Sequence, residues 1–328
     1  MPTRITRRAM LGAFGLTAAM CRSGRAAAPD WPARTIKVVV GGSAGSVPDT
    51  LARLAAAALA ETLGQSIIIE NRPGAAGIVA MHAIVSSAPD GYTLGLATIS
   101  QAVFNSYLYR KLSYDPRRDL LPVSTLATSA SVLVAHPGVQ ANSLAELVAL
   151  SKQEPSKLLI GIPASGSPPH IAALLLLRET GLSASFVPFR SGPDAVQGAL
   201  RGDIQLLVDG PTLLAPQVAE GRLKAFVFMG HERTAILRDV PTIAEAGFGS
   251  ATAESWLGLV APRDTPTAIV EALSRATRTI TAKSEYRDAL ERISMRPTAS
   301  TPEAFATLIA QEHQHWSPLL SAANLKLD

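Results

Sequence analysis

The chain has 328 residues, of which 47% are hydrophobic, 17% charged and 5% aromatic. This composition is typical of a globular protein with a packed core, excludes a disordered or collagen-like chain, and at this length suggests about two domains. The net charge is +4, but the first 28 residues hold five of the 30 basic residues and no acidic residue, so the rest carries 25 basic against 26 acidic residues. A body this close to neutrality lacks the basic excess of a nucleic-acid-binding protein, and no nucleic-acid partner is expected.

Residues 1–28 have the order of an export signal. Arg7 and Arg8 precede an apolar stretch over 9–20, and three alanines end at Ala28. This pattern predicts a twin-arginine signal peptide that is cleaved near Ala28 and releases the protein into a bacterial periplasm. An uncleaved anchor helix is the alternative, but a run of about 12 apolar residues is shorter than the ~20 that span a bilayer. The sequence leaves open whether Cys21 is ever lipidated.

The sequence gives little support for a metal site or for cysteine-based chemistry. Cys21 is the only cysteine, so residues 29–328 have no disulfide, thiolate nucleophile or cysteine-bound metal. His313 and His315 are two residues apart on a predicted helix and therefore diverge, and the histidines show no H-E-x-x-H spacing. We expect neither a metal nor a cofactor.

Short β-branched runs alternate with longer amphipathic stretches along the body. The periodicity, with Gly and Pro as stop signals, predicts two sets of elements. The predicted strands are 35–40, 66–69, 92–97, 120–126, 131–135, 158–162, 185–188, 204–208 and 224–228. The predicted helices are 49–63, 77–86, 143–152, 168–180, 193–201, 212–219, 266–281, 284–293 and 302–322. A capping box, Ser143 with Glu146, marks the start of the third helix.

This alternation predicts an α/β fold in which mostly parallel sheets are flanked by helices. No Gly/Ser linker separates two halves, so we expect the chain to cross between two domains more than once. The extended stretches near 125–132 and 252–258 are the expected crossings and would form a hinge. The predicted domains are 29–127 together with 255–328, and 128–254.

Five loops follow predicted strands and are rich in glycine, proline or hydroxyls. They are Gly41–Asp49, Thr98–Gln101, Pro163–His170, Phe189–Asp194 and Asp209–Thr212. Right-handed crossovers place such loops in one crevice, where free N–H groups at helix starts attract an anion. The first loop lacks the lysine of a Walker loop and the G-x-G-x-x-G spacing, so we do not expect a nucleotide there, while carboxylate binding stays open. A tight turn without ligand is the alternative for this loop.

For several individual side chains, the sequence allows more than one role. Ser165 and Ser167 lie near His170, which would suit a serine hydrolase, but neither serine sits in the G-x-S-x-G elbow. Asp209 either caps the following helix or accepts a hydrogen bond from a ligand ammonium. Trp256 is expected in hinge or core packing more than in a ligand stack.

At these residues the sequence resembles the periplasmic receptors of tripartite tricarboxylate transporters, also called Bug proteins. The resemblance spans nearly the whole mature chain. The sequence segments that match the family are Ile68–Gly77, Ala88–Leu94, Leu112–Pro116, Gly166–His170, Val187–Arg190 and Asp239–Gly247.

The resemblance implies a two-domain, type II Venus-flytrap receptor, without enzymatic activity, that binds a small carboxylate or related metabolite through amides, hydroxyls and waters. It further implies presentation of the closed form to a membrane permease, and we expect a monomer. By position, the residues implied to face the ligand are Ser43, Ala44, Gly45, Ser46, Asp49, Thr98, Ser100, Ser165, Gly166, Ser167, His170, Arg190 and Asp209. A ligand sensor for a membrane signalling protein is the alternative function, and a serine hydrolase a lesser one.

The chain departs from the family pattern in its first loop. Gly41-Gly42 stand where Pro-Phe is usual, and Pro48 replaces the hydroxyl residue before Asp49. In the fourth loop Asp194 adds a negative charge. These departures leave the identity of the ligand open.

Overall fold

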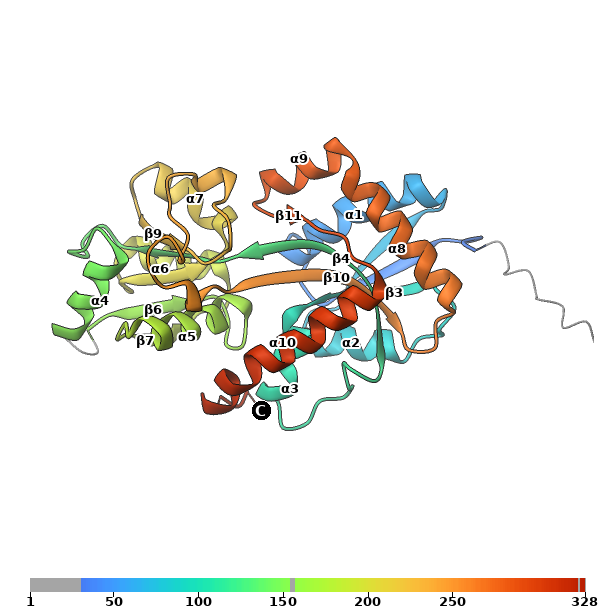
Figure 1. Cartoon of the computed structure of the whole chain (residues 1–328), viewed down its shortest axis with the longest axis horizontal. Coiled ribbons are helices and arrows are strands. Elements are labelled where there is room, and N and C mark those ends of the chain that lie inside the picture. The colour runs from blue at the N-terminus through green and yellow to red at the C-terminus, as the bar shows by residue number, and fades with distance from the viewer. Residues whose placement is uncertain (1–30, 154–156, 324, 328) are drawn as a thin grey trace, which may run out of the picture. The chain divides into compact units, whose positions relative to one another are not determined.

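The computed structural model describes residues 31–153, 157–323 and 325–327 (Figure 1). The predicted signal peptide, with its cleavage point and Cys21, lies outside these residues. The strands are β1 (Ile36–Val40), β2 (Ile67–Asn71), β3 (Thr93–Thr98), β4 (Leu120–Ala130), β5 (Val132–Ala135), β6 (Leu159–Ile162), β7 (Ser185–Pro188), β8 (Leu206–Asp209), β9 (Lys224–Phe228), β10 (Glu254–Pro262) and β11 (Arg296–Pro297).

The helices alternate with these strands. They are α1 (Val47–Leu63), α2 (Ile78–Val85), α3 (Asn105–Leu108), α4 (Leu144–Gln153), α5 (Pro168–Thr180), α6 (Gly192–Arg201), α7 (Pro211–Ala219), α8 (Thr267–Ala282), α9 (Ser284–Arg292) and α10 (Pro302–Ala322), with short helical turns η1 (Ala75–Gly77), η2 (Ser100–Phe104), η3 (Ala235–Leu237) and η4 (Gly249–Ala251). The predicted capping box starts α4: the Ser143 hydroxyl accepts from Glu146 N at 3.2 Å, and the Glu146 carboxylate accepts from Asn142 N at 2.8 Å.

The first sheet has the strand order β11-β4-β10-β3-β1-β2. β1 is parallel to both of its neighbours, β2 and β3, whereas β10 is antiparallel to β3 and β4. α2 packs closely on β3 because Gly95 has no side chain: a Cβ there would lie 2.3 Å from Ile84 Cδ1. In Figure 1, α1 and α8 lie on the other side of this sheet from α2 and α10.

The second sheet has the order β7-β6-β8-β5-β9. Its central strands β5 and β8 are buried along their whole length, as their continuous apolar runs predict, whereas the edge strand β7 is partly exposed. Along β5, Val132 and Val134 face a core that includes Leu214 of α7, while Leu133 faces a core that includes Ile171 of α5. Alternate side chains of β5 therefore pack against helices on opposite faces of the sheet.

The chain passes from the first sheet to the second between Ala130 and Val132 and returns in β10. β4 and β10 pair antiparallel, with Glu254 opposite Ala130 at the point where the first sheet ends. We call the elements around the first sheet lobe 1 and those around the second lobe 2. The residue numbers given above for the domain boundaries stay a prediction.

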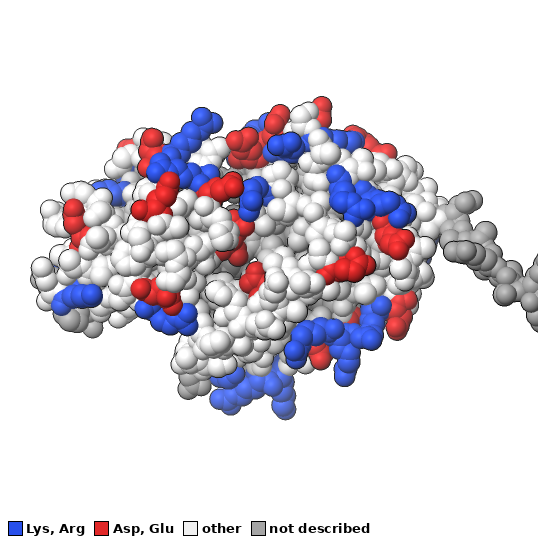
Figure 2. Space-filling model, viewed as in Figure 1, with Lys and Arg blue, Asp and Glu red and all other residues white. Residues whose placement is uncertain are grey.

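The two-domain α/β fold is confirmed, and both sheets are mixed. The parallel strands are β2-β1-β3 and β7-β6-β8, whereas β4, β10 and β5 run antiparallel to their neighbours. The chain leaves lobe 1 along β4 and returns along β10, so these two paired strands run in opposite directions. They therefore cannot both be parallel to the other strands of the first sheet. No helix in the described part of the chain is long and apolar enough to cross a membrane. On the face shown in Figure 2, basic and acidic side chains are interspersed over both lobes.

Candidate functional site

A cavity of about 620 Å³ lies between the lobes. This volume is within the range of ligand pockets, ~300–1,000 Å³. All five loops predicted from the sequence contribute to its lining, and each follows the carboxyl end of a strand. The lining side chains from these loops with polar or charged groups are Ser43, Ser46, Thr98, Ser100, Gln101, Ser165, Ser167, Arg190, Asp209 and Thr212.

Two hydroxyls of lobe 1 stand out in this lining. Ser46 precedes the first turn of α1, and Ser100 follows β3 and is 5% exposed. Among the described residues, neither hydroxyl has a hydrogen-bond partner. Both oxygens are buried, and a buried hydroxyl without a partner costs free energy, so each can form a hydrogen bond that the described residues do not supply. Thr98 differs, because its hydroxyl donates to Oε1 of Gln101.

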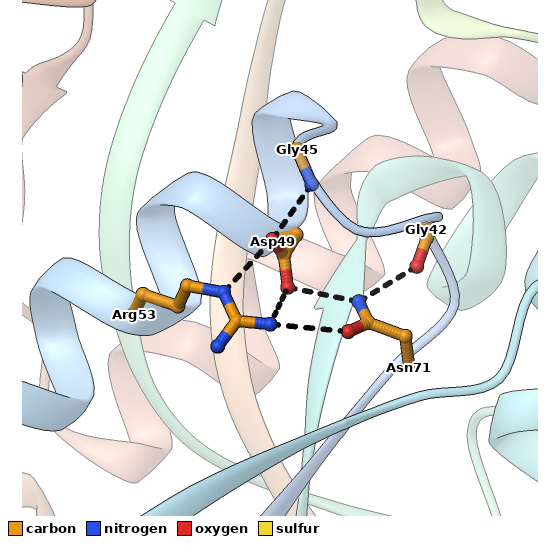
Figure 3. Close-up of polar contacts among 5 residues, drawn as sticks. All are labelled: Gly42, Gly45, Asp49, Arg53 and Asn71. Carbon is orange, nitrogen blue, oxygen red and sulfur yellow. Dashed lines mark hydrogen bonds and ion pairs between the residues drawn. The ribbon is translucent and has the colours of Figure 1, made fainter.

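The first loop is held by a buried carboxylate, shown in Figure 3. Asp49 accepts from Gly45 N at 2.8 Å and from Arg53 Nε at 3.0 Å through Oδ2, and from Asn71 Nδ2 at 2.9 Å through Oδ1. The same Asn71 amide also donates to the Gly42 carbonyl at 2.9 Å. Burial alone would raise the pKa of Asp49, but the hydrogen bonds from Arg53, Gly45 and Asn71 outweigh it and lower the pKa. The ionised carboxylate therefore ties the loop to α1 and β2.

Three predicted site residues of this loop lie away from the cavity. Ala44, Gly45 and Asp49 line a shallow surface depression beside Arg53 instead. The Gly45 amide, expected to face an anion, is already bonded to Asp49. A part for these three in binding stays a prediction, and in this structure they shape the loop that carries Ser46.

The loop after β6 has a comparable internal anchor. The Gly166 N–H donates to Nδ1 of His170 at 2.9 Å, and the His170 ring packs edge-on against Phe186 with centroids 4.9 Å apart. His170 is 4% exposed, and burial lowers its pKa to about 4. The ring is therefore neutral near pH 7, holds Gly166 in place and does not line the cavity, whereas Ser165, Gly166 and Ser167 do.

The geometry of this loop does not support a serine nucleophile. The Ser167 hydroxyl donates to the Ala164 carbonyl at 2.7 Å and accepts from the backbone N–H of His170. The His170 ring accepts from Gly166 through Nδ1, and among the described residues neither serine is hydrogen-bonded to the ring, as a hydrolase nucleophile would be. Within the described ranges, no cluster of three or more His, Cys, Asp or Glu residues is placed to hold a metal.

Lobe 2 also places Arg190 and Asp209 at the cavity. They are the charged side chains among its described lining residues. Arg190 is exposed, whereas Asp209, at the end of β8, is 7% exposed. The two loops that carry them bring opposite charges to one wall of the cleft.

Sequence reasoning missed several lining residues. Ile293 and Met295 come from the segment between α9 and β11, and Gly74–Gly77 from the segment before α2. Ala75 and Ala76 there have φ of 44° and 50°, a left-handed conformation that is unusual for alanine. The backbone strain is compatible with a functional loop. Trp256 both lines the cavity and packs edge-on against Phe305, with centroids 4.9 Å apart.

Two lobes joined by antiparallel strands, with a cavity between them that carries hydroxyl groups from both lobes, define a solute-binding protein of the periplasmic type II class. The chain belongs to the tripartite tricarboxylate transporter receptor family, whose model matches residues 51–325. Members of this family are periplasmic solute-binding receptors.

Individual relatives agree with this assignment over most of the chain. Protein BugT of Bordetella pertussis is 29% identical over 97% of this chain and 98% of its own. A Rhodopseudomonas palustris protein solved with adipate is 30% identical, with a TM-score of 0.81, and the match covers 90% of this chain and 100% of that one. MatC from Rhodopseudomonas palustris with bound malate is 32% identical, with a TM-score of 0.76, over 88% of this chain and 100% of that one.

Proposed function

We propose that this protein captures a small carboxylate in the periplasm and delivers it to the membrane permease of a tripartite tricarboxylate transporter. The observation that carries the proposal is the pair of unpartnered hydroxyls, Ser46 and Ser100, at a cavity between two lobes. The adipate and malate in the two solved relatives support a carboxylate.

The mode of binding follows from which donors are free. Gly45 and Gly166 use their amides inside their own loops, and the first two residues of α5, Pro168 and Pro169, have no N–H. Hydroxyl groups therefore donate more of the hydrogen bonds to the ligand carboxylate than the amides at the helix starts, which the sequence led us to expect. Hydrogen bonds to a charged group contribute ~1.5–3 kcal/mol each. Closure of the lobes would then stabilise the complex, because the ligand contacts both walls only in the closed form.

Binding and delivery need separate experiments. Calorimetric titration of the exported protein with mono- and dicarboxylates should show binding, and Ser100→Ala should weaken it by about tenfold or more. Ser185→Ala is the matched control, since Ser185 is exposed on β7 and away from the cavity. Equal affinity in Ser100→Ala and the control would contradict the proposed grip.

Delivery is tested by uptake of the radiolabelled ligand into cells that lack this protein. Uptake should return with the wild-type gene and remain low with Ser100→Ala at ligand concentrations below the variant's Kd. Uptake that is independent of this protein, despite tight binding in solution, would contradict delivery and favour a sensor.

A further inference from the structure

Asp209 is a buried carboxylate with an oxygen that the protein does not satisfy. Its Oδ1 accepts from Gly210 N at 2.7 Å. Its Oδ2 has no hydrogen-bond partner among the described residues, although the side chain is only 7% exposed. Buried carboxylates are normally paired or hydrogen-bonded through both oxygens, so this one calls for an explanation.

Helix capping does not explain it. The N-cap of α7 is Gly210, which has no side-chain cap bond, and Pro211, the first residue of the helix, has no N–H to donate. The bond from Asp209 goes to the N–H of Gly210 and not to the first turn of the helix. Of the two roles that the sequence allows, acceptance from a ligand is therefore the one that fits.

The free oxygen is packed against the backbone of a glycine, which admits no side chain there. Gly192, the first residue of α6, approaches it so closely that a Cβ there would lie 2.6 Å from Oδ2 and 2.7 Å from Leu213 Cδ1. Arg190 is the other charged group at this wall, but it is exposed and makes no ion pair with Asp209 within the described part of the chain. Among the residues that the structure describes, no cation therefore compensates the carboxylate.

Burial without a neighbouring cation changes the pKa of Asp209. Burial raises the pKa of Asp209 to about 6, against the smaller effect of the Gly210 hydrogen bond. Near pH 7 the side chain is still mostly ionised, so its free oxygen is a strong acceptor in a water-poor wall. A second carboxylate placed there would be repelled, whereas a hydroxyl or amino group would be attracted.

We propose that Asp209 determines specificity by accepting a hydrogen bond from a hydroxyl or amino group of the ligand, so that the preferred ligand is a hydroxy- or amino-carboxylate. This inference rests on the proposed function, since it assumes that a carboxylate occupies the cleft. The ligand carboxylate lies at Ser46 and Ser100, and its donor group reaches Asp209 across the cavity.

Matched ligands test the inference. One set is succinate, malate and aspartate, and another is adipate, 2-hydroxyadipate and 2-aminoadipate; within a set only one substituent changes. Titration of the wild-type protein should show that the tightest substituted acid of a set binds at least tenfold more strongly than its unsubstituted parent, which corresponds to about 1.4 kcal/mol.

Variants locate the preference. Asp209→Asn keeps an acceptor for Gly210 but replaces the free acceptor oxygen by an NH₂ donor, so the preference should fall to within about twofold. Asp209→Ala should lower the preference to the same extent, and it shows whether the result depends on the asparagine side chain. Asp203→Ala, at an exposed ion pair with Arg201, is the control and should keep the preference.

The outcomes separate this inference from the proposed function. If carboxylates bind but substituted and unsubstituted acids bind equally, or if the preference survives in both Asp209 variants, the inference is wrong and the proposed function stands. If no carboxylate of any set binds to the wild-type protein, the proposed function is contradicted, and the inference falls with it.

Discussion

The hydroxyl of Thr212 donates a 2.7 Å hydrogen bond to the carbonyl oxygen of Ile293. Thr212 lies in the first turn of α7 in lobe 2, and Ile293 follows α9 in lobe 1. Both residues line the cavity. This bond therefore links the two lobes directly across one rim of the cleft, and it can form only when the lobes are close together.

Loss of this bond should favour the open form. A single neutral hydrogen bond contributes ~1 kcal/mol, so Thr212→Val should shift the closed–open ratio about fivefold and weaken ligand binding to a similar extent. Small-angle scattering of the ligand-free protein should show a larger radius of gyration. Thr212→Ser retains the hydroxyl and should behave like the wild type. Identical scattering and affinity in Thr212→Val would show that the bond has no part in closure.

Asp49 should contribute to stability more than to direct ligand contact. Asp49→Ala removes the acceptor of the Gly45 N–H and one acceptor each of Asn71 and Arg53, so we expect a loss of about 1–3 kcal/mol in urea unfolding. Asp203→Ala, at an exposed ion pair, should cost less than ~1 kcal/mol. If Asp49→Ala is as stable as Asp203→Ala, the network in Figure 3 does not anchor the loop.

Gly166 should resist substitution for two reasons that can be separated. Its φ is +75°, and a Cβ would lie 2.7 Å from Leu327 and 2.9 Å from Leu108. Gly221 has a similar φ of +69° but open space around it, so Gly221→Ala measures the backbone cost alone, about 1 kcal/mol. Gly166→Ala should cost clearly more in thermal or urea unfolding. Equal losses in the two variants would mean that the crowding is relieved without cost.

Stability should fall as the pH rises through the titration range of Glu312. Burial raises the pKa of Glu312 to about 7, although the Trp316 indole N–H donates to its carboxylate at 2.5 Å. Between pH 4.5 and 7 the unfolded chain releases the proton that the folded protein retains, so unfolding becomes easier with rising pH. Glu312→Gln should remove up to about 3 kcal/mol of this dependence.

The comparison with a control isolates the effect, because other groups titrate in the same range. Glu271→Gln changes an exposed residue of α8 and should keep the wild-type pH profile. Urea unfolding at pH 5, 6, 7 and 8 provides the profiles. A profile for Glu312→Gln that is parallel to the wild type would contradict a proton retained on this side chain.

The sequence predicted the order of elements well because local periodicity determines it. Apolar β-branched runs such as 36–40 and amphipathic stretches such as 168–180 have one favourable structure each. The meeting of five loops at one cavity followed from the same pattern, since the carboxyl ends of neighbouring parallel strands lie at one edge of a sheet.

Other features depend on contacts between distant residues and were not predictable. The pairing of β4 with β10 joins segments more than 120 residues apart, and it makes the sheets mixed. The sequence could not show that Asp49 and the His170 ring accept hydrogen bonds from the Gly45 and Gly166 amides. Ile293 reaches the cleft only because the chain returns to lobe 1, and no local signal marks it.

The distance between a bound carboxylate and two hydroxyls tests the central claim most directly. A crystal structure of the protein with its tightest carboxylate ligand measures it. We predict that the ligand carboxylate lies within hydrogen-bond distance, about 3.5 Å or less, of Ser46 Oγ and Ser100 Oγ, with the lobes closed. A carboxylate held elsewhere, with both hydroxyls still unpartnered, would contradict the account.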